Sequence, residues 1–235
     1  MCSRCYNIAT EKKRGFYAMK LTKEELKGLR KMIENTTAKV LVRYENDNLN
    51  NQVEVENLFI GDSMIEFMNL GKYLPELNSL NRGVAGATTM FVRNHLDTIF
   101  GLLEPKNIFI SIGSNDLVLL ESSVDEAFKQ VIDLLDIIGK KYPKTKIYYL
   151  STTPVVSENH KLYKKNFIGG RTNGELKALN YKIKTYLDNQ TKQYIHLFDC
   201  LLDDKGYLNS AYTADGIHLN SEGYQVYAKN IMDAI

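Results

Sequence analysis

The sequence predicts an α/β fold in which a five-stranded parallel sheet is covered by helices on both faces. From residue 55 onward, short apolar runs alternate with longer segments in which apolar residues recur at helical spacing. Small, polar and ionisable residues follow the apolar runs, and open parallel sheets bind their ligands at the carboxyl ends of the strands. The length of 235 residues suits one domain of this kind with a small extension.

Strands are expected at the apolar runs 55–61, 80–84, 107–113, 146–152 and 193–200. Helices are expected between and after them, at 64–74, 88–103, 124–141, 173–189 and 221–234. This alternation implies parallel strands joined by crossover helices, with both faces of the sheet buried.

Residues 1–50 are interpreted as an N-terminal extension that packs on a main domain of residues 51–235. A capping-box pattern followed by an apolar stripe predicts a helix over residues 21–36. Residues 38–47 have the pattern of a short strand followed by a polar turn. A separate partner-binding role for the extension is the alternative.

The charge balance offers no reason to expect a nucleic-acid partner or an anionic membrane. Lys and Arg total 30 against 28 Asp and Glu, which leaves a formal net charge of +2. No apolar run approaches the roughly 18–20 residues of a membrane span, and the N-terminus lacks a secretory pattern. We therefore expect a cytoplasmic protein without integral membrane association, and a homo-oligomer is an open alternative.

The three cysteines do not form a recognisable framework. Their odd number argues against paired disulfides and fits a reducing compartment. Cys2 and Cys5 have CxxC spacing, but no second pair completes a zinc site, and Cys200 is far away along the chain. Ordinary thiols are expected, with a metal or redox role for Cys2 and Cys5 as the alternative.

His218 is the strongest candidate for a general base. Acyl transfer at a serine needs a nucleophile, a base, a group that orients the base, and donors for the developing oxyanion. Asp215 precedes His218 by three residues, so one tight loop could bring its carboxylate to Nδ1 and leave Nε2 free. The other histidines lie in a predicted helix (His95), a polar loop (His160) and a predicted strand (His196). An ordinary turn with an incidental histidine is the alternative.

Ser63 lies at the predicted junction between the first strand and the first helix of the sheet region. Gly61 ends the apolar run, and the free N–H groups at a helix start would favour a serine oxygen that carries negative charge. A simple helix cap is the alternative for Ser63. Gly86 and Asn115, which follow the next two strands, could donate a backbone N–H and a side-chain amide to an oxyanion. Taken singly, both are also common turn residues.

Four sequence blocks together resemble those of the SGNH, or GDSL-type, hydrolases. They contain Gly61-Asp62-Ser63, Gly86, Gly113-Ser114-Asn115-Asp116 and Asp215-Gly216-Ile217-His218, in the order of that family. The resemblance extends from about residue 55 to the C-terminus. "NRGVAGATT" and "YTADGIHLNSEGY" are most similar to the branch related to platelet-activating-factor acetylhydrolases. Met64 replaces the usual Leu or Ile after GDS, which is a small, volume-preserving departure.

The resemblance implies a flavodoxin-like three-layer α/β/α sandwich and a serine esterase. By this resemblance Ser63 is the nucleophile, His218 the base and Asp215 the orienting acid. The backbone N–H groups of Ser63 and Gly86 and the side chain of Asn115 would form the oxyanion hole. Neither a metal nor an organic cofactor is implied. Asp199, at the end of the last predicted strand, is the alternative orienting acid. Asp62 and Asp116, which also belong to the four blocks, are expected to be structural.

The expected substrate is an ester of a small or short-chain acyl group, acetyl above all, carried by a small molecule or a carbohydrate. A lysophospholipase or thioesterase for longer acyl chains is one alternative, and a catalytically silent binding module on the same fold is another. The loop 153–174 leaves the catalytic edge of the sheet and is expected to influence specificity. Its basic residues, Arg171 among them, are expected to be solvated, with contact to an anionic leaving group as the alternative.

Overall fold

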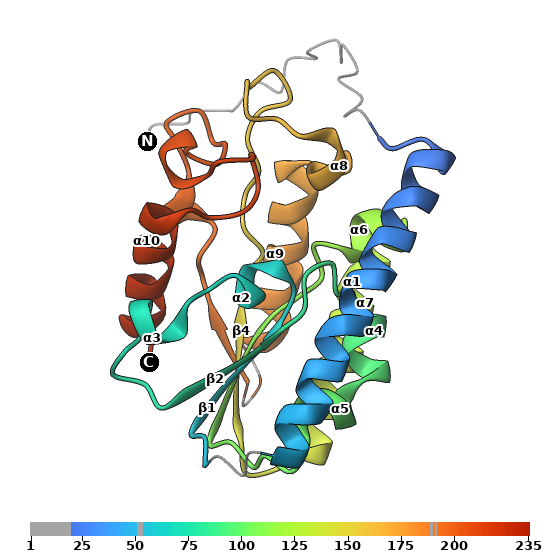
Figure 1. Ribbon diagram of the computed structural model, residues 1–235. Helices are drawn as coiled ribbons and strands as arrows, with labels where there is room; N and C mark the ends of the chain where they lie inside the picture. The colour runs from blue at the N-terminus through green and yellow to red at the C-terminus, as the bar shows by residue number, and fades with distance from the viewer. Residues whose placement is uncertain (1–19, 51–53, 189, 191) are drawn as a thin grey trace, which may run out of the picture.

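The computed structural model describes residues 20–50, 54–188, 190 and 192–235. In this part of the chain, five parallel strands form one sheet in the order β2-β1-β3-β4-β5 (Figure 1). The strands are β1 (Asn57–Gly61), β2 (Ser79–Gly83), β3 (Asn107–Ser111), β4 (Lys146–Leu150) and β5 (Gln193–Ile195). The order reverses between β1 and β3, and in doubly wound sheets this switch point is where ligands bind.

The described helices are α1 (Lys23–Asn50), α2 (Ser63–Glu66), α3 (Leu70–Tyr73), α4 (Thr89–Asn94), α5 (Leu96–Phe100), α6 (Asp116–Leu119), α7 (Val124–Lys141), α8 (Lys165–Ile168), α9 (Asn173–Leu187) and α10 (Ser221–Met232). Short 3-10 helices lie at Asp199–Leu201 and Ser210–Tyr212. No helix in the described residues is long and apolar enough to cross a membrane.

Helices cover both faces of the sheet, which confirms the predicted three-layer sandwich (Figure 1). On one face Phe59, Phe109 and Tyr148 stack in a row, with ring centroids 4.4 and 4.8 Å apart, beneath α2, α3 and α10. On the other face Leu58 and Ile60 pack with α4, α5, α7 and α9. Neighbouring residues of a strand point to opposite faces, so burial of both faces explains the continuous apolar runs.

Two predicted helices are each divided in two. The segment 64–74 contains α2 and α3, because Asn69 starts a new helix by accepting a hydrogen bond from the N–H of Lys72. The segment 88–103 contains α4 and α5, and His95, with φ −121°, ends α4. The last predicted strand is shorter than expected and ends at Ile195.

The predicted strand at 38–47 is wrong, because one continuous helix of 28 residues, α1, runs through it. The β-branched and aromatic residues there favour a strand locally. In the helix, however, Val40 and Tyr44 are four residues apart and lie on one face. Tyr44 is only 2% exposed, and its hydroxyl donates to the carbonyl oxygen of Gly83 at 2.6 Å. Packing against the sheet region therefore outweighs local propensity.

The cysteine hypotheses can be tested only at Cys200, since Cys2 and Cys5 lie outside the described residues. Cys200 is a free thiol that donates to the carbonyl oxygen of Leu197. Burial raises the pKa of this thiol to about 11, so it stays protonated at neutral pH.

Candidate active site

The structure brings the predicted site residues together at the carboxyl ends of β1, β2 and β3. Ser63, Gly86, Asn115 and His218 line one pocket of about 350 Å³. Each comes from a different loop or helix start, and Asp215 lies directly behind His218. This is the edge of the sheet, beside the switch point, at which open parallel sheets bind ligands.

Ser63, His218 and Asp215 form a continuous chain of hydrogen bonds. Nε2 of His218 lies 3.1 Å from the Ser63 hydroxyl oxygen, and Nδ1 lies 2.7 Å from Oδ2 of Asp215. The other oxygen of Asp215 accepts from the backbone N–H groups of Ile217 and His218 at 3.1 and 2.9 Å. Burial alone would raise the pKa of Asp215, but these bonds outweigh it and the pKa lies below its ordinary value. Asp215 is therefore held as a carboxylate that fixes the His218 ring.

Ser63 is not the cap of its helix. Asp62 is the N-cap of α2 and accepts a hydrogen bond from the N–H of Met64 at 3.0 Å. The Ser63 hydroxyl is thereby free to face His218. Gly61 makes the bend possible, because its φ is +136° and a Cβ there would lie 1.9 Å from the carbonyl oxygen of Ser111.

The three residues expected to supply oxyanion donors line the pocket from different segments of the chain. The N–H of Ser63 belongs to the first turn of α2, where helix N–H groups lack an intrahelical acceptor. Gly86 has φ +80°, and within the described part of the chain its N–H makes no backbone hydrogen bond. Asn115 donates one of its two amide hydrogens to the carbonyl oxygen of Ala87 at 3.0 Å, which leaves the other for a ligand.

Arg171 is buried behind Asn115, so the expectation that it is solvated was wrong. Its side chain donates to Oδ1 of Asn115 at 3.2 Å and to the hydroxyl of Ser114 at 2.6 Å. Burial lowers the pKa of Arg171 to about 10, although the negative charges of Asp62 and Asp116 oppose the shift. The guanidinium therefore remains charged at neutral pH. By holding Oδ1, Arg171 fixes the orientation of the Asn115 amide.

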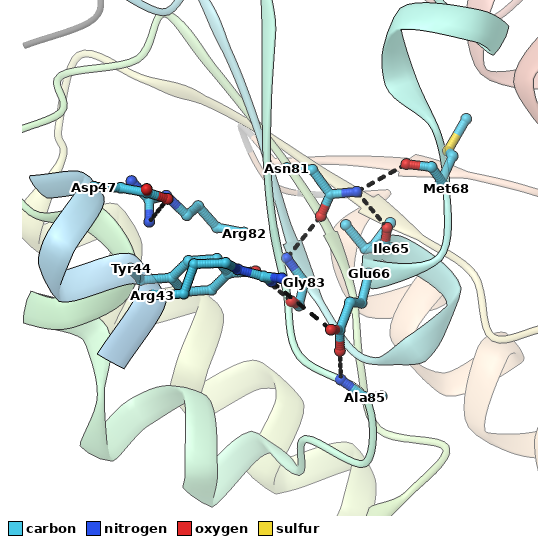
Figure 2. A network of polar contacts seen from close by, with 10 residues as sticks. All are labelled: Arg43, Tyr44, Asp47, Ile65, Glu66, Met68, Asn81, Arg82, Gly83 and Ala85. Carbon is cyan, nitrogen blue, oxygen red and sulfur yellow. Dashed lines mark hydrogen bonds and ion pairs between the residues drawn. The ribbon is translucent and has the colours of Figure 1, made fainter. Parts of the chain in front are cut away.

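Glu66 holds the loop that carries Gly86, a role that the sequence patterns did not indicate. Its carboxylate accepts a hydrogen bond from the N–H of Ala85, the residue before Gly86 (Figure 2). The other carboxylate oxygen lies 3.8 Å from the guanidinium of Arg43 on α1. Because Glu66 follows Ser63 by one helical turn, α2 connects the candidate nucleophile with the Gly86 loop.

Asn81 ties the beginning of the same loop to α2. Its side-chain amide donates to the carbonyl oxygens of Ile65 and Met68, and its Oδ1 accepts from the N–H of Gly83 at 2.9 Å (Figure 2). Together with Tyr44, which binds the Gly83 carbonyl, this network holds the end of β2 between α2 and α1.

Asp199 and the other histidines lie away from the pocket. Asp199 forms a surface pair with His196, with Oδ2 and Nε2 2.9 Å apart and both side chains about half exposed or more. His95 packs on the ring of Phe91, and none of the other three histidines lines the pocket. The structure therefore favours Asp215 over Asp199 as the partner of His218.

Asp62 and Asp116 are buried carboxyl groups. Asp116 accepts hydrogen bonds from the N–H and hydroxyl of Thr89, which joins the starts of α6 and α4. Burial raises the pKa of each carboxyl to about 6, although hydrogen bonds and the charge of Arg171 oppose the shift. Their contacts support the expected structural role.

We expect Asp116→Asn to reduce the pH dependence of stability between pH 4.5 and 7.5. The folded-state pKa of Asp116 is about 6, whereas the ordinary value in an unfolded chain is about 3.9. Between these two pKa values the folded state binds more protons than the unfolded state. The contribution of the Asp116 carboxyl group to the free energy of unfolding is therefore largest below pH 4 and is lost as the pH rises through 6. The fall in the free energy of unfolding over this interval should shrink by about 2 kcal/mol, measured by urea unfolding.

The control for this measurement is Asp133→Asn, which changes an exposed carboxylate on α7. It should leave the pH dependence as in the wild type. Equal falls in the wild type and in Asp116→Asn would contradict the assignment of a raised pKa to Asp116.

Comparisons with known proteins relate the chain to one family and to several solved structures. Residues 59–226 match the sequence profile of the GDSL-like lipase/acylhydrolase family. A Streptococcus pneumoniae structure whose name refers to platelet activating factor is 28% identical, with a TM-score of 0.78, and the match covers 91% of this chain and 99% of that one. A Bacteroides fragilis structure whose name refers to an acylhydrolase shares the fold at 22% identity and a TM-score of 0.70, and the match covers 83% of this chain and 94% of that one.

A curated relative is larger than this chain. The N-acylneuraminate cytidylyltransferase of Escherichia coli O18:K1:H7 is 27% identical over 183 residues, which are 75% of this chain and 39% of that protein. The chain thus spans about two fifths of the length of that relative. An acetyl-xylooligosaccharide esterase from Geobacillus shares the fold at 14% identity and a TM-score of 0.56, covering 78% of this chain and 95% of its own.

Proposed function

The chain belongs to the GDSL-like lipase/acylhydrolase family, and from this premise we propose that it hydrolyses esters of short acyl groups through an acyl-enzyme at Ser63. The observation that carries the proposal is the hydrogen-bonded chain from the Ser63 hydroxyl through His218 to Asp215. A serine in this setting can lose its proton to the imidazole as it attacks.

In the first half of the reaction, Oγ of Ser63 attacks the acyl carbon and its proton passes to Nε2 of His218. The negative charge on the former carbonyl oxygen is stabilised by the Ser63 and Gly86 N–H groups and by Asn115. Asp215 stabilises the imidazolium that forms. The bond from the acyl carbon to the alcohol oxygen then breaks, and His218 gives its proton to the departing alcohol.

In the second half, a water molecule attacks the acyl-enzyme. Nε2 of His218 takes a proton from the water, and the same donors stabilise the second oxyanion. The bond to Ser63 breaks, Oγ recovers its proton from His218, and the carboxylic acid leaves. Each proton that His218 accepts is returned within the same half-reaction, so turnover leaves the site unchanged.

We expect Asn115→Ala to lower kcat for ester hydrolysis about a hundredfold. The variant removes one oxyanion donor, which typically raises the barrier by about 3 kcal/mol. KM should change little, because the amide interacts more strongly with the oxyanion than with the carbonyl group of the bound ester. Steady-state kinetics with p-nitrophenyl acetate measure both constants.

The matched control is Asn159→Ala, an exposed asparagine in the loop after β4 that does not line the pocket. It should retain wild-type kinetics. A kcat for Asn115→Ala within twofold of the wild-type value, in a folded variant, would overturn the role proposed for Asn115.

The acyl group is proposed to be short, with acetyl esters of carbohydrates as the leading class. The name of one relative, an acetyl-xylooligosaccharide esterase, supports an acetyl ester, and the name of a second, which refers to N-acylneuraminate, supports a sugar as its carrier. A panel of p-nitrophenyl acetate, butyrate and octanoate, O-acetylated N-acetylneuraminate and acetylated xylooligosaccharide tests this proposal. The highest kcat/KM on an acetyl ester would support it, whereas the highest value on octanoate would overturn it.

A longer acyl chain is the second candidate, and the lining of the pocket is the observation that favours it. Apolar side chains from α1, among them Leu29, Ile33 and Val40, line the pocket that contains Ser63. An apolar pocket of this size binds more than an acetyl group. Rising kcat/KM from acetate to octanoate, together with activity on lysophospholipids, would identify this function.

A further inference from the structure

One wall of the pocket is made by helix α1 and not by a loop at the end of a strand. The α1 residues that line it are Leu29, Met32, Ile33, Thr36, Thr37 and Val40. They are spaced three and four apart, so they form one face of the helix. Figure 1 shows α1 as the long helix at the N-terminal end of the described chain, running alongside the sheet region. The segment that lies outside the matched family region thus contributes directly to the candidate active site.

Ile33 lies directly against the oxyanion loop. A Cβ built on Gly86 would come within 2.7 Å of Cγ2 of Ile33, so the two residues are in close contact. Gly86 lines the pocket and is the residue whose N–H is an expected oxyanion donor. The side chain of Ile33 is therefore within the space that surrounds the reacting carbonyl group, and its size limits that space.

The α1 wall is attached on both sides of the pocket. Toward its N-terminal end, Nε of Arg30 donates to the carbonyl oxygen of Leu119 at 2.9 Å. Toward its C-terminal end, Tyr44 donates to the Gly83 carbonyl at 2.6 Å, as Figure 2 shows. These two contacts fix the position of α1 relative to Ser63. A side chain can discriminate between acyl chains of different length only if its position is fixed in this way.

The chemistry assigns the two halves of an ester to different sides of the pocket. The alcohol oxygen must take its proton from Nε2 of His218, so the leaving group lies beside His218. Phe67 and Phe167 contact this imidazole edge-on, with ring centroids 5.1 and 5.6 Å away, and both are partly exposed at the mouth. The side formed by α1, with Ile33 against Gly86, remains for the acyl chain.

We propose that α1 is the acyl-binding wall of this enzyme and that Ile33 sets the length of acyl chain that it accepts. This inference rests on the proposed ester hydrolysis at Ser63 and deepens it by naming the specificity-determining residue. Each methylene that a pocket accepts or excludes changes kcat/KM by roughly tenfold or more. A change of side-chain volume at Ile33 should therefore be visible in an acyl-length series.

The test compares Ile33→Ala and Ile33→Phe with the wild type on p-nitrophenyl acetate and octanoate. The leaving group is the same in both esters, so the ratio of their kcat/KM values reports only on the acyl side. Ile33→Ala should raise the octanoate-to-acetate ratio about tenfold, and Ile33→Phe should lower it by a similar factor. Met32 lies at a more exposed position of the same wall, and Met32→Ala should raise the octanoate-to-acetate ratio as Ile33→Ala does. It provides a second test if the Ile33 variants unfold.

The control is Val42→Ala, which shortens an aliphatic residue of α1 that is 55% exposed and lies outside the pocket. Its ratio should equal that of the wild type. A ratio that stays constant in all folded wall variants, even if overall activity falls, would overturn the inference while the proposed function stands. A wild type that hydrolyses none of these esters would instead overturn the proposed function, and the inference with it.

Discussion

Ser63→Ala is expected to reduce kcat for ester hydrolysis by roughly 10⁴- to 10⁶-fold. The variant removes the oxygen atom that is proposed to form the acyl-enzyme, while the residues proposed as oxyanion donors and the pocket remain. The free energy of unfolding should change by less than about 1 kcal/mol, because Asp62 and not Ser63 caps α2. Hydrolysis of p-nitrophenyl acetate and urea unfolding measure the two effects separately.

The matched control for this variant is Ser210→Ala. Ser210 is also the first residue of a short helix, the 3-10 helix Ser210–Tyr212, whose cap is the preceding Asn209. It is exposed and lies outside the pocket, so activity should be unchanged. Activity of Ser63→Ala within tenfold of the wild type would contradict the proposed nucleophile.

The second large effect is expected for Asp215→Asn, with a loss in kcat of about 10⁴-fold. An asparagine at this position can donate a hydrogen bond to Nδ1, which would favour the tautomer that places a proton on Nε2. Nε2 could then not accept the Ser63 proton. The pKa of Asp215 lies below its ordinary value because of its bonds to His218, so the wild-type carboxylate is ionised throughout the neutral range.

Asp199→Asn is the matched control for Asp215→Asn. Asp199 also lies three residues from a histidine, and its carboxylate oxygen is 2.9 Å from Nε2 of His196. This pair is on the surface and outside the pocket, and surface pairs contribute little to stability. Wild-type activity for Asp199→Asn is expected, and a larger loss there than for Asp215→Asn would reverse the assignment of the orienting acid.

The residues at the strand ends were predictable because local rules determine them. The bend directly after the buried strand β1 needs glycine at Gly61. The tight turn between Asp215 and His218 needs it at Gly216, where a Cβ would lie 2.7 Å from the carbonyl oxygen of Leu162. Parallel strands bring their carboxyl ends to one edge of the sheet. Ser63 and Asn115 could therefore be expected at one edge of the sheet, whereas the assignment of His218 to the same site depended on the family resemblance.

The supporting residues were not predictable, because their roles depend on contacts between distant segments. Arg171 reaches Asn115 across 56 residues of chain, and in sequence it is one basic residue in a basic loop. Glu66 looks like an ordinary helix residue until the Gly86 loop is folded against it. The β-branched residues of α1 favoured a strand locally, and only burial of Tyr44 against the end of β2 shows why a helix is stable there.

The most direct test of the central claim, that Ser63 is the nucleophile, is labelling with a fluorophosphonate followed by peptide mass spectrometry. The serine oxygen attacks phosphorus and fluoride leaves, so the reagent marks an activated serine. We expect a single adduct on the peptide that contains Ser63 in the wild type, and none in Ser63→Ala. Labelling of a different residue, or equal labelling of the wild type and Ser63→Ala, would contradict the claim.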